Sequence, residues 1–373
     1  WKSRTAALDL TNPEVEDWLR TVFRQLVDWG FDYFKIDFIF AGIRHGRRTR
    51  PEYSPVEAYR HGLQIIRETI GDRFLLGCGA PIGPSVGLVD ALRVSEDVLE
   101  KWHNPLWEWL GRGCGVPSAS GSLRNNIQRH YFHKKLWLND PDCLLVRDRN
   151  SKLKPAEVRT LVTLLGLTGG MLFLSDDLTR LEPERLEWAK AVLPPTDLTG
   201  APQGQFQNEY PELFRVKGRS AQILAITNWH KRSRIFDLAE YVKPGHFIFD
   251  FWGERFWKPA SAKLLPHATL ACQVTAFSGT PQVVGTTLHL TALADERLSQ
   301  KFDGDKNLLF IKNEKLARAT GKIWISVPTG YVYFGAELDG QIQTIESWEQ
   351  GIVIAIDQSA PWQLTVKFIE SPG

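Results

Sequence analysis

The chain has 373 residues, of which 43% are hydrophobic and 24% are charged, and its formal net charge is +2. This composition is typical of a globular protein long enough for two domains, and the near-neutral charge gives no reason to expect nucleic acid or an anionic membrane surface as a partner. No apolar run is long enough to cross a membrane. The four cysteines are scattered without a CxxC pair, which favours a reducing compartment such as the cytoplasm over a disulfide framework.

Strand and helix signals alternate through the first half of the chain. The predicted helices cover residues 13–29, 54–71, 119–134, 155–167 and 183–192. The predicted strands cover residues 33–40, 74–78, 91–94, 136–138 and 170–174. Asn12-Pro13 and the capping box Ser54-Pro55-Val56-Glu57 indicate the first two helix starts. The predicted buried face of the first helix consists of Val15, Trp18, Val22, Leu26 and Trp29.

This alternation of apolar strands with helices predicts a parallel sheet, either open or closed into a barrel. No GxGxxG motif follows a strand, so a dinucleotide-binding open sheet has no support. Polar residues cluster just after the strands, where a (β/α)8 TIM barrel places its active site. About five strand–helix units are present, so we predict the C-terminal part of a TIM barrel. The chain opens at Trp1 and its single methionine is Met171, so we expect the first barrel strands and any export signal to lie upstream.

The second half of the chain has an all-β pattern. Pro194-Pro195 marks the predicted boundary between a barrel portion, residues 1–194, and a β-sandwich domain, residues 195–373. The predicted strands cover residues 222–229, 247–252, 269–277, 322–327, 331–336, 351–356 and 363–368. Turn residues separate them, as in a β-sandwich. A further break near residue 280 would give two β subdomains.

Lys35 and Asp37 lie two residues apart in an apolar segment, so they project from the same strand face. A structural salt bridge is the simplest interpretation, because a buried charge needs a partner. Further carboxylates follow the predicted strands, namely Asp90, Asp97, Asp140, Asp142, Asp176 and Asp177. The histidines lack ligand spacing, so we expect no metal. Glycoside hydrolysis, by contrast, needs only two carboxylates flanking a sugar.

Several of these segments together resemble one family. They are Lys35-Ile36-Asp37, Gly77-Cys78-Gly79-Ala80-Pro81, Arg93-Val94-Ser95-Glu96-Asp97, residues 137–144 and residues 169–178. These segments resemble the motifs of glycoside hydrolase family 36 α-galactosidases and occur in the same order. The resemblance extends from Asp9 to about Leu193. The resemblance implies a retaining α-galactosidase that acts on oligosaccharides such as raffinose or melibiose, without a cofactor. It also implies a β-rich C-terminal domain.

The resemblance gives roles to individual residues. Asp37 corresponds to the nucleophile, and Asp97, four residues after Arg93, corresponds to the acid/base. The adjacent Glu96 is a departure from many relatives, and we favour Asp97 by its spacing. The residues that we predict to bind substrate are Lys35, Cys78, Arg93, Trp102 and Asp140. Arg93 either binds substrate or holds Asp97.

For several of these residues a purely structural interpretation remains open. Cys78 can be a small core residue, and Asp140 and Asp142 can cap loops or bind Arg147. Trp102, Trp107 and Trp109 can stack on sugar rings or simply pack. Asp176 and Asp177 can cap the turn after the last barrel strand. The basic segment 44–50 is either a solvated loop or a lid.

Three other functions remain alternatives to hydrolysis of α-galactosides. The same covalent intermediate can be captured by a sugar hydroxyl, which would make the chain a galactosyl transferase of the raffinose synthase type. An inactive carbohydrate-binding fragment and an α-N-acetylgalactosaminidase are the others. The predicted partner is an α-galactoside oligosaccharide, and the sequence leaves a homo-oligomer open.

Overall fold

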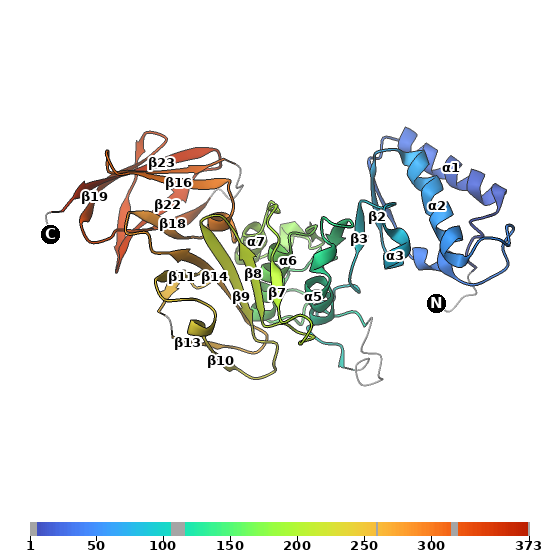
Figure 1. The fold of residues 1–373 in the computed structure, drawn as a ribbon, viewed down its shortest axis with the longest axis horizontal. Coiled ribbons are helices and arrows are strands. Elements are labelled where there is room, and N and C mark those ends of the chain that lie inside the picture. Colours follow the sequence, from blue (N-terminus) through green and yellow to red (C-terminus); the bar gives the residue numbers. More distant parts are fainter. Residues whose placement is uncertain (1–5, 106–115, 259, 315–319, 372–373) are drawn as a thin grey trace. The chain divides into compact units, whose positions relative to one another are not determined.

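The structure is a computed structural model that describes residues 6–105, 116–258, 260–314 and 320–371 (Figure 1). The chain divides into two compact units. Unit 1 consists of residues 1–96 and 129–142, and unit 2 consists of residues 97–128 and 143–373. None of the helices in the described ranges has the length and apolar content that crossing a bilayer requires.

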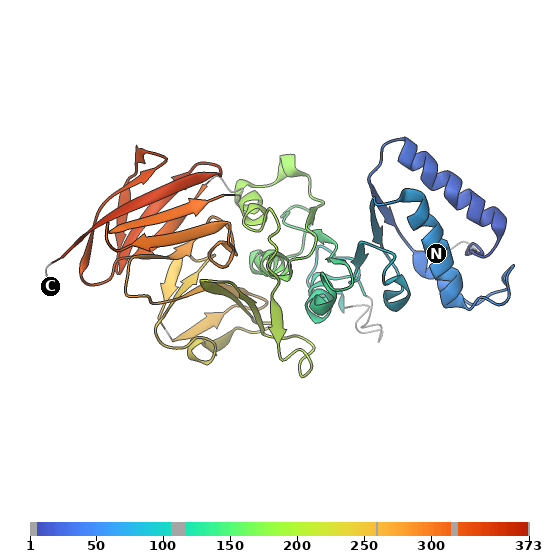
Figure 2. The same cartoon turned by 45° about the horizontal axis from the view of Figure 1, so that its top comes forward.

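Unit 1 is built on a four-stranded parallel sheet with the strand order β1-β2-β3-β4. The strands are β1 (Tyr33–Ile36), β2 (Phe74–Gly77), β3 (Ala91–Arg93) and β4 (Leu138–Asp140). The helices are α1 (Pro13–Asp28), α2 (Pro55–Ile70) and α3 (Ile82–Ser85), with the 3-10 turns η1 (Ile39–Ile43) and η2 (His130–Phe132). Helices α1 and α2 lie side by side (Figures 1 and 2). Their apolar side chains share one core with the strands.

The first two helices begin as predicted, but the buried face of α1 differs. In α2, the capping box of Ser54 and Glu57 is formed, and the predicted core face is buried. In α1, the buried residues are Leu19 and Phe23, whereas Trp18 and Trp29 are 53% and 66% exposed. The prediction for these two tryptophans was wrong, because Leu19 and Phe23 form a competing apolar pair four residues apart on a neighbouring face.

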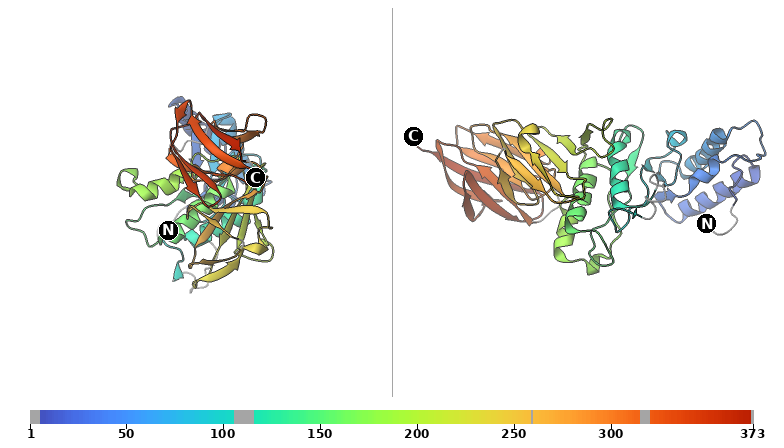
Figure 3. Two further views of the ribbon diagram at one scale, coloured as in Figure 1. Left: turned by 90° about the vertical axis from the view of Figure 1, so that its left-hand side faces the viewer. Right: turned by 90° about the horizontal axis from the view of Figure 1, so that it is seen from below.

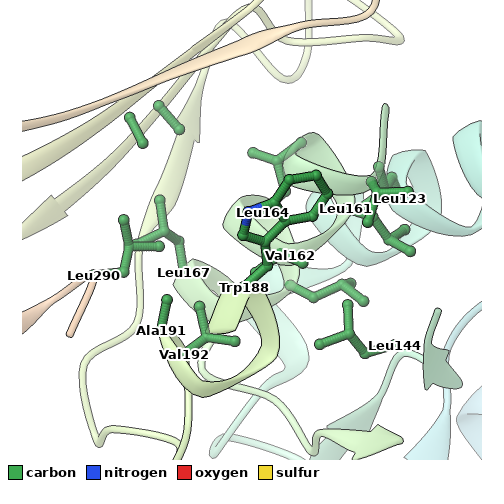
Figure 4. Close-up of a cluster of buried hydrophobic side chains, with 14 of the residues drawn as sticks. Leu123, Leu144, Leu161, Val162, Leu164, Leu167, Trp188, Ala191, Val192 and Leu290 are labelled. Atoms are coloured by element: carbon green, nitrogen blue, oxygen red, sulfur yellow. The ribbon is translucent and has the colours of Figure 1, made fainter. Parts of the chain in front are cut away.

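In the residues that the structure describes, the first part of unit 2 includes the following helices and a short parallel pair of strands. The helices are α5 (Ala119–Gln128), α6 (Pro155–Thr168) and α7 (Pro183–Lys190), and the strands are β5 (Cys143–Leu144) and β6 (Phe173–Leu174). Their buried side chains continue into those of the following β-sheet, and Leu290, beyond that sheet in sequence, lies beside Leu167 and Val192 of this cluster (Figure 4). One core therefore spans the predicted boundary at residue 194.

An antiparallel six-stranded sheet follows, with the strand order β12-β11-β14-β9-β8-β7. The strands are β7 (Ala201–Gln203), β8 (Leu213–Lys217), β9 (Ala221–Thr227), β11 (His246–Asp250), β12 (Arg255–Trp257) and β14 (Thr269–Ala276). β10 (Arg234–Asp237) and β13 (Ser261–Leu264) pair separately. Helix α6 packs on this sheet through β8, β9 and β14. We call this six-stranded sheet the C-terminal sheet.

The rest of unit 2 consists of two further antiparallel sheets (Figure 3). The first has the order β15 (Gln282–Thr286), β18 (Thr320–Ser326), β22 (Gly351–Asp357), β21 (Ile345–Trp348). The second has the order β16 (Leu298–Asp303), β17 (Leu308–Asn313), β23 (Trp362–Glu370), β19 (Tyr331–Leu338), β20 (Gln341–Ile342). Both sheets contribute to one buried cluster, as in a sandwich. All the strands predicted in the second half are present.

The fold is thus an α/β region with parallel strands, followed by antiparallel β-sheets. Four of the parallel strands belong to unit 1, and β5 and β6 belong to unit 2. Closure of these strands into a TIM barrel remains a prediction, as does the domain boundary after residue 194.

Candidate active site

The strand β1 presents Tyr33 and Lys35 on one face, and Asp37 directly follows the strand. Tyr33, Lys35 and Asp37 are exposed, whereas Phe34 between them is buried. This alternation is that of a strand with one face packed on a core and the other face open. The salt-bridge interpretation assumed burial, but both Lys35 and Asp37 are exposed. β1 ends at Ile36, so Asp37 lies directly after the carboxyl end of the strand.

The Asp37 carboxylate lies in a tight turn against the loop that follows β2. Asp37 Oδ1 accepts a hydrogen bond of 2.6 Å from the amide of Phe38, whose backbone is left-handed with a φ of 56°. The Cys78 amide donates to Ile36 O at 2.8 Å, which joins the two strand ends. A Cβ added to Gly79 would lie 3.4 Å from Asp37 Oδ1 and 3.3 Å from the Phe38 backbone. Glycine at position 79 therefore allows the two loops to approach closely.

The Cys78 side chain is 6% exposed and lies close to the Asp37 carboxylate. Burial, and then the nearby Asp37 carboxylate, raise the pKa of the Cys78 thiol to about 11. The thiol is therefore protonated at neutral pH. Unit 1 thus brings together the predicted nucleophile and a predicted substrate-binding residue.

A buried ion-pair cluster lies at the ends of β3 and β4. Arg93 Nε is 3.0 Å from Asp140 Oδ2, and Arg93 Nη2 is 2.8 Å from Asp142 Oδ1. The Asp142 amide also donates to Asp140 Oδ1 at 2.8 Å. Burial alone would lower the pKa of Arg93, but the two carboxylates outweigh it and the pKa is raised. Asp140 and Asp142 thus hold Arg93 in its charged form.

Tyr33 is a residue of this region that the sequence analysis did not select. Burial raises its pKa first, and the charge of Asp140 raises it further, while Arg93 opposes this. Its ring stacks on Phe74 of the neighbouring strand, with centroids 5.1 Å apart. The available signal was its position two residues before Lys35, because this spacing puts it on the same face of β1.

The other two predicted site residues belong to unit 2. Asp97 is exposed and lies directly before the buried Val98. Trp102 is 5% exposed and packs against His267 and Trp229, which is the packing alternative left open above. Its role in binding sugar, the acid/base role of Asp97 and the separation of the two catalytic carboxyl groups remain predictions. Trp107 and Trp109 lie outside the described residues.

Asp176 and Asp177 have structural partners in unit 2. Asp176 Oδ2 accepts hydrogen bonds from the amides of Val146 and Arg147, at 2.6 and 3.1 Å. Asp176 Oδ1 lies 2.8 Å from Arg147 Nη1. Asp177 accepts from the amide of Thr179 and caps the 3-10 turn η3 (Leu178–Arg180). The predicted capping role of Asp177 is therefore confirmed, and Arg147 pairs with Asp176.

The basic segment 44–50 is tied down at its end. Asp9 Oδ2 accepts hydrogen bonds from the amide and hydroxyl of Thr49, at 2.6 and 2.8 Å. Burial raises the pKa of Asp9, but the bonds from Thr49 and Thr11 outweigh this and lower it to about 2. Among the described residues, no group of three or more His, Cys, Asp or Glu side chains is arranged to hold a metal ion.

No family model matches the sequence. Solved structures do match parts of the chain. TtGalA, an α-galactosidase from Thermus thermophilus solved with stachyose, is 34% identical over 50% of this chain and 39% of its own, with a TM-score of 0.45. The chain is similar to α-galactosidases. It spans about two-fifths of the length of the Thermus enzyme, since it covers 39% of that chain.

Two further structures match more of the chain at lower identity. A GH27 β-L-arabinopyranosidase from Geobacillus stearothermophilus is 14% identical over 74% of this chain and 65% of its own, with a TM-score of 0.52. The α-galactosidase of Saccharomyces cerevisiae, solved with raffinose, is 13% identical over 68% of this chain and 74% of its own, with a TM-score of 0.47. The similarity to the Geobacillus enzyme is one of fold: an α/β region followed by antiparallel sheets.

Proposed function

We propose that this chain carries the catalytic machinery of a retaining α-galactosidase that removes terminal α-galactosyl residues from oligosaccharides. The observation that carries the proposal is the environment of Asp37. Its carboxylate directly follows a parallel strand that carries Lys35, and it lies close to a protonated Cys78 thiol. The substrate class comes from the resemblance of the ordered motifs to family 36.

In this proposal Asp37 attacks the anomeric carbon and forms a covalent glycosyl intermediate. Asp97 protonates the leaving oxygen and then removes a proton from the incoming water. Two inversions give net retention, which requires the two carboxyl groups to be about 5–5.5 Å apart in the working enzyme. General acid assistance of this type contributes about 10²–10⁴-fold to the rate.

The neighbouring residues have supporting roles. Lys35 lies two residues before Asp37, where an ammonium favours the ionised nucleophile and can bind sugar hydroxyls. The protonated Cys78 thiol lies close to the carboxylate and can donate a hydrogen bond to it. Arg93 is held charged by Asp140 and Asp142, so it can present a fixed positive charge at the carboxyl ends of β3 and β4.

The proposal is tested with an aryl α-galactoside and the variant Asp37→Ala. We expect turnover to fall by about 10⁴-fold or more, since the covalent step is lost, and added azide to restore activity with an inverted galactosyl azide. The matched control is Asp32→Ala, because Asp32 is an exposed carboxylate in the same segment whose partner is Arg73. Full activity in Asp37→Ala would refute the nucleophile assignment. Product analysis with sucrose as acceptor separates hydrolysis from transfer.

A further inference from the structure

The predicted acid/base lies in a short segment of unit 2, residues 97–104, which we call the acid loop. Asp97 itself is exposed, but Val98 and Trp102 are 8% and 5% exposed and belong to the main buried cluster of unit 2. The Trp102 carbonyl accepts hydrogen bonds from the amide and hydroxyl of Ser120, at 3.1 and 2.6 Å. An exposed carboxylate is thus followed directly by a firmly packed stretch of chain.

The indole of Trp102 packs on residues of the C-terminal sheet. Its ring stacks on His267, with centroids 4.9 Å apart and an interplanar angle of 15°. It also stacks on Trp229, at 6.0 Å and 29°. Trp229 lies after the end of β9, and His267 lies before the start of β14. These two strands are paired neighbours, so the acid loop rests on one end of the C-terminal sheet.

His267 is itself held in place from two sides. Its Nδ1 atom lies 2.6 Å from Glu157 Oε1, with both side chains buried. Its carbonyl accepts a hydrogen bond of 2.7 Å from the hydroxyl of Thr160. Glu157 is in turn fixed at the start of α6, where its other oxygen accepts from the Lys154 amide at 2.8 Å. The imidazole is therefore a rigid surface against which Trp102 can pack.

We propose that Trp102 and His267 are positioning residues that fix the acid loop on the C-terminal sheet and thereby determine where the Asp97 carboxylate is held. This inference rests on the proposed function, because it takes Asp97 as the general acid. It differs from the role that the sequence suggested for Trp102, which was direct stacking on a sugar. In this arrangement the C-terminal sheet contributes to catalysis through the loop that it supports.

The test compares Trp102→Phe with Trp188→Phe in the full chain. Trp188 is 7% exposed and belongs to the same buried cluster, but its ring packs under Arg185 and Arg159. Each variant is assayed on melibiose, whose leaving group needs protonation, and on dinitrophenyl α-galactoside, whose leaving group does not. We expect Trp102→Phe to lower kcat/KM about tenfold on melibiose and less than about threefold on the activated substrate. Trp188→Phe should change kcat/KM by the same factor on both substrates.

A second variant, His267→Asn, removes the stacked ring. His267 has a φ of 59°, and asparagine tolerates this left-handed backbone better than most residues. We expect the same selective loss on melibiose. Equal losses on both substrates in Trp102→Phe and His267→Asn, or an increase of KM alone, would overturn the positioning role. Equal losses in Asp97→Ala, or an inactive wild type, would instead overturn the proposed function, and the positioning role with it.

Discussion

Asp37 in unit 1 and Asp176 in unit 2 each follow a short parallel strand closely, yet their surroundings are opposite. The Asp176 side chain is fully buried and takes hydrogen bonds from two amides and one guanidinium. Asp37 is exposed and accepts a hydrogen bond from the Phe38 amide. A buried carboxylate that accepts three hydrogen bonds from its own protein has a structural role, whereas one that is open toward solvent retains the capacity to react with a substrate.

The largest effect expected from this contrast is on stability. Asp176→Ala should lower the free energy of unfolding by about 3 kcal/mol or more, because it leaves Arg147 and two amides without their shared acceptor. Asp37→Ala should change it by no more than about 0.5 kcal/mol, as for an exposed substitution. Urea unfolding of both variants measures this. Similar losses in the two would contradict the distinction drawn between the two carboxylates.

A second expected effect is the response of unit 2 to acid. Burial lowers the pKa of His289 to about 4 from its usual value of 6.5. A depressed pKa means that folding favours the neutral imidazole. The contribution of His289 to the free energy of unfolding is therefore complete above pH 6.5 and is lost as the pH falls towards 4. Between pH 6.5 and 4 the free energy of unfolding can fall by about 3 kcal/mol.

Thermal unfolding of the wild type and His289→Asn between pH 7 and 4 checks the contribution of His289. Asparagine carries no titratable proton, and its carbonyl can accept from the Thr291 amide as His289 Nδ1 does, at 3.2 Å. We expect the wild type to lose more stability than the variant as the pH falls. Parallel pH profiles would show that His289 is not the group responsible.

A third effect is smaller and concerns the close approach of the two loops around Asp37. Gly79→Ala and Gly87→Ala should each cost about 1 kcal/mol, because both glycines have positive φ values, of 53° and 80°. Only at position 79 does the new Cβ also meet the Asp37 turn; at Gly87 no heavy atom lies within 4 Å. We therefore expect Gly79→Ala alone to reduce kcat by about tenfold, since a small misplacement of a nucleophile is costly. Equal activity in the two variants would argue against a positioned Asp37.

Much of this architecture follows from local sequence signals. Helix starts with Pro at the first position, such as Pro13 and Pro55, and strands with apolar runs, such as 74–77, are specified by neighbouring residues. The meeting of Asp37 with Cys78 could also be expected, because parallel strands end at the same edge of a sheet. Among the missed strands, β16 has a mixed polar composition without a clean alternation, whereas β17 was overlooked although it begins with the apolar run 308–311.

Other features depend on residues that are far apart in the sequence. The ion pairs of Arg93 involve carboxylates more than 40 positions away, and no spacing rule predicts such a cluster. The packing of Trp102 on His267 joins segments separated by more than 160 residues. The same long-range packing puts residues 97–128 in one unit with the C-terminal sheet and the two sheets that follow it. The alternation of strands and helices alone does not indicate this grouping.

The smallest expected effect is on the reactivity of the Cys78 thiol, which lies close to Asp37. A pKa of about 11 leaves only about one Cys78 thiol in a thousand ionised at pH 8, so alkylation by iodoacetamide should be slow. Removal of the carboxylate in Asp37→Ala takes away the nearby acceptor and charge that raise this pKa, while burial remains. We therefore expect a severalfold faster reaction of Cys78 in that variant, measured by peptide mapping. The fully buried Cys272 is the internal control, because its main shift comes from burial, and its rate should not change. An unchanged Cys78 rate would mean that burial alone protects the thiol and that the Asp37 carboxylate does not interact with it.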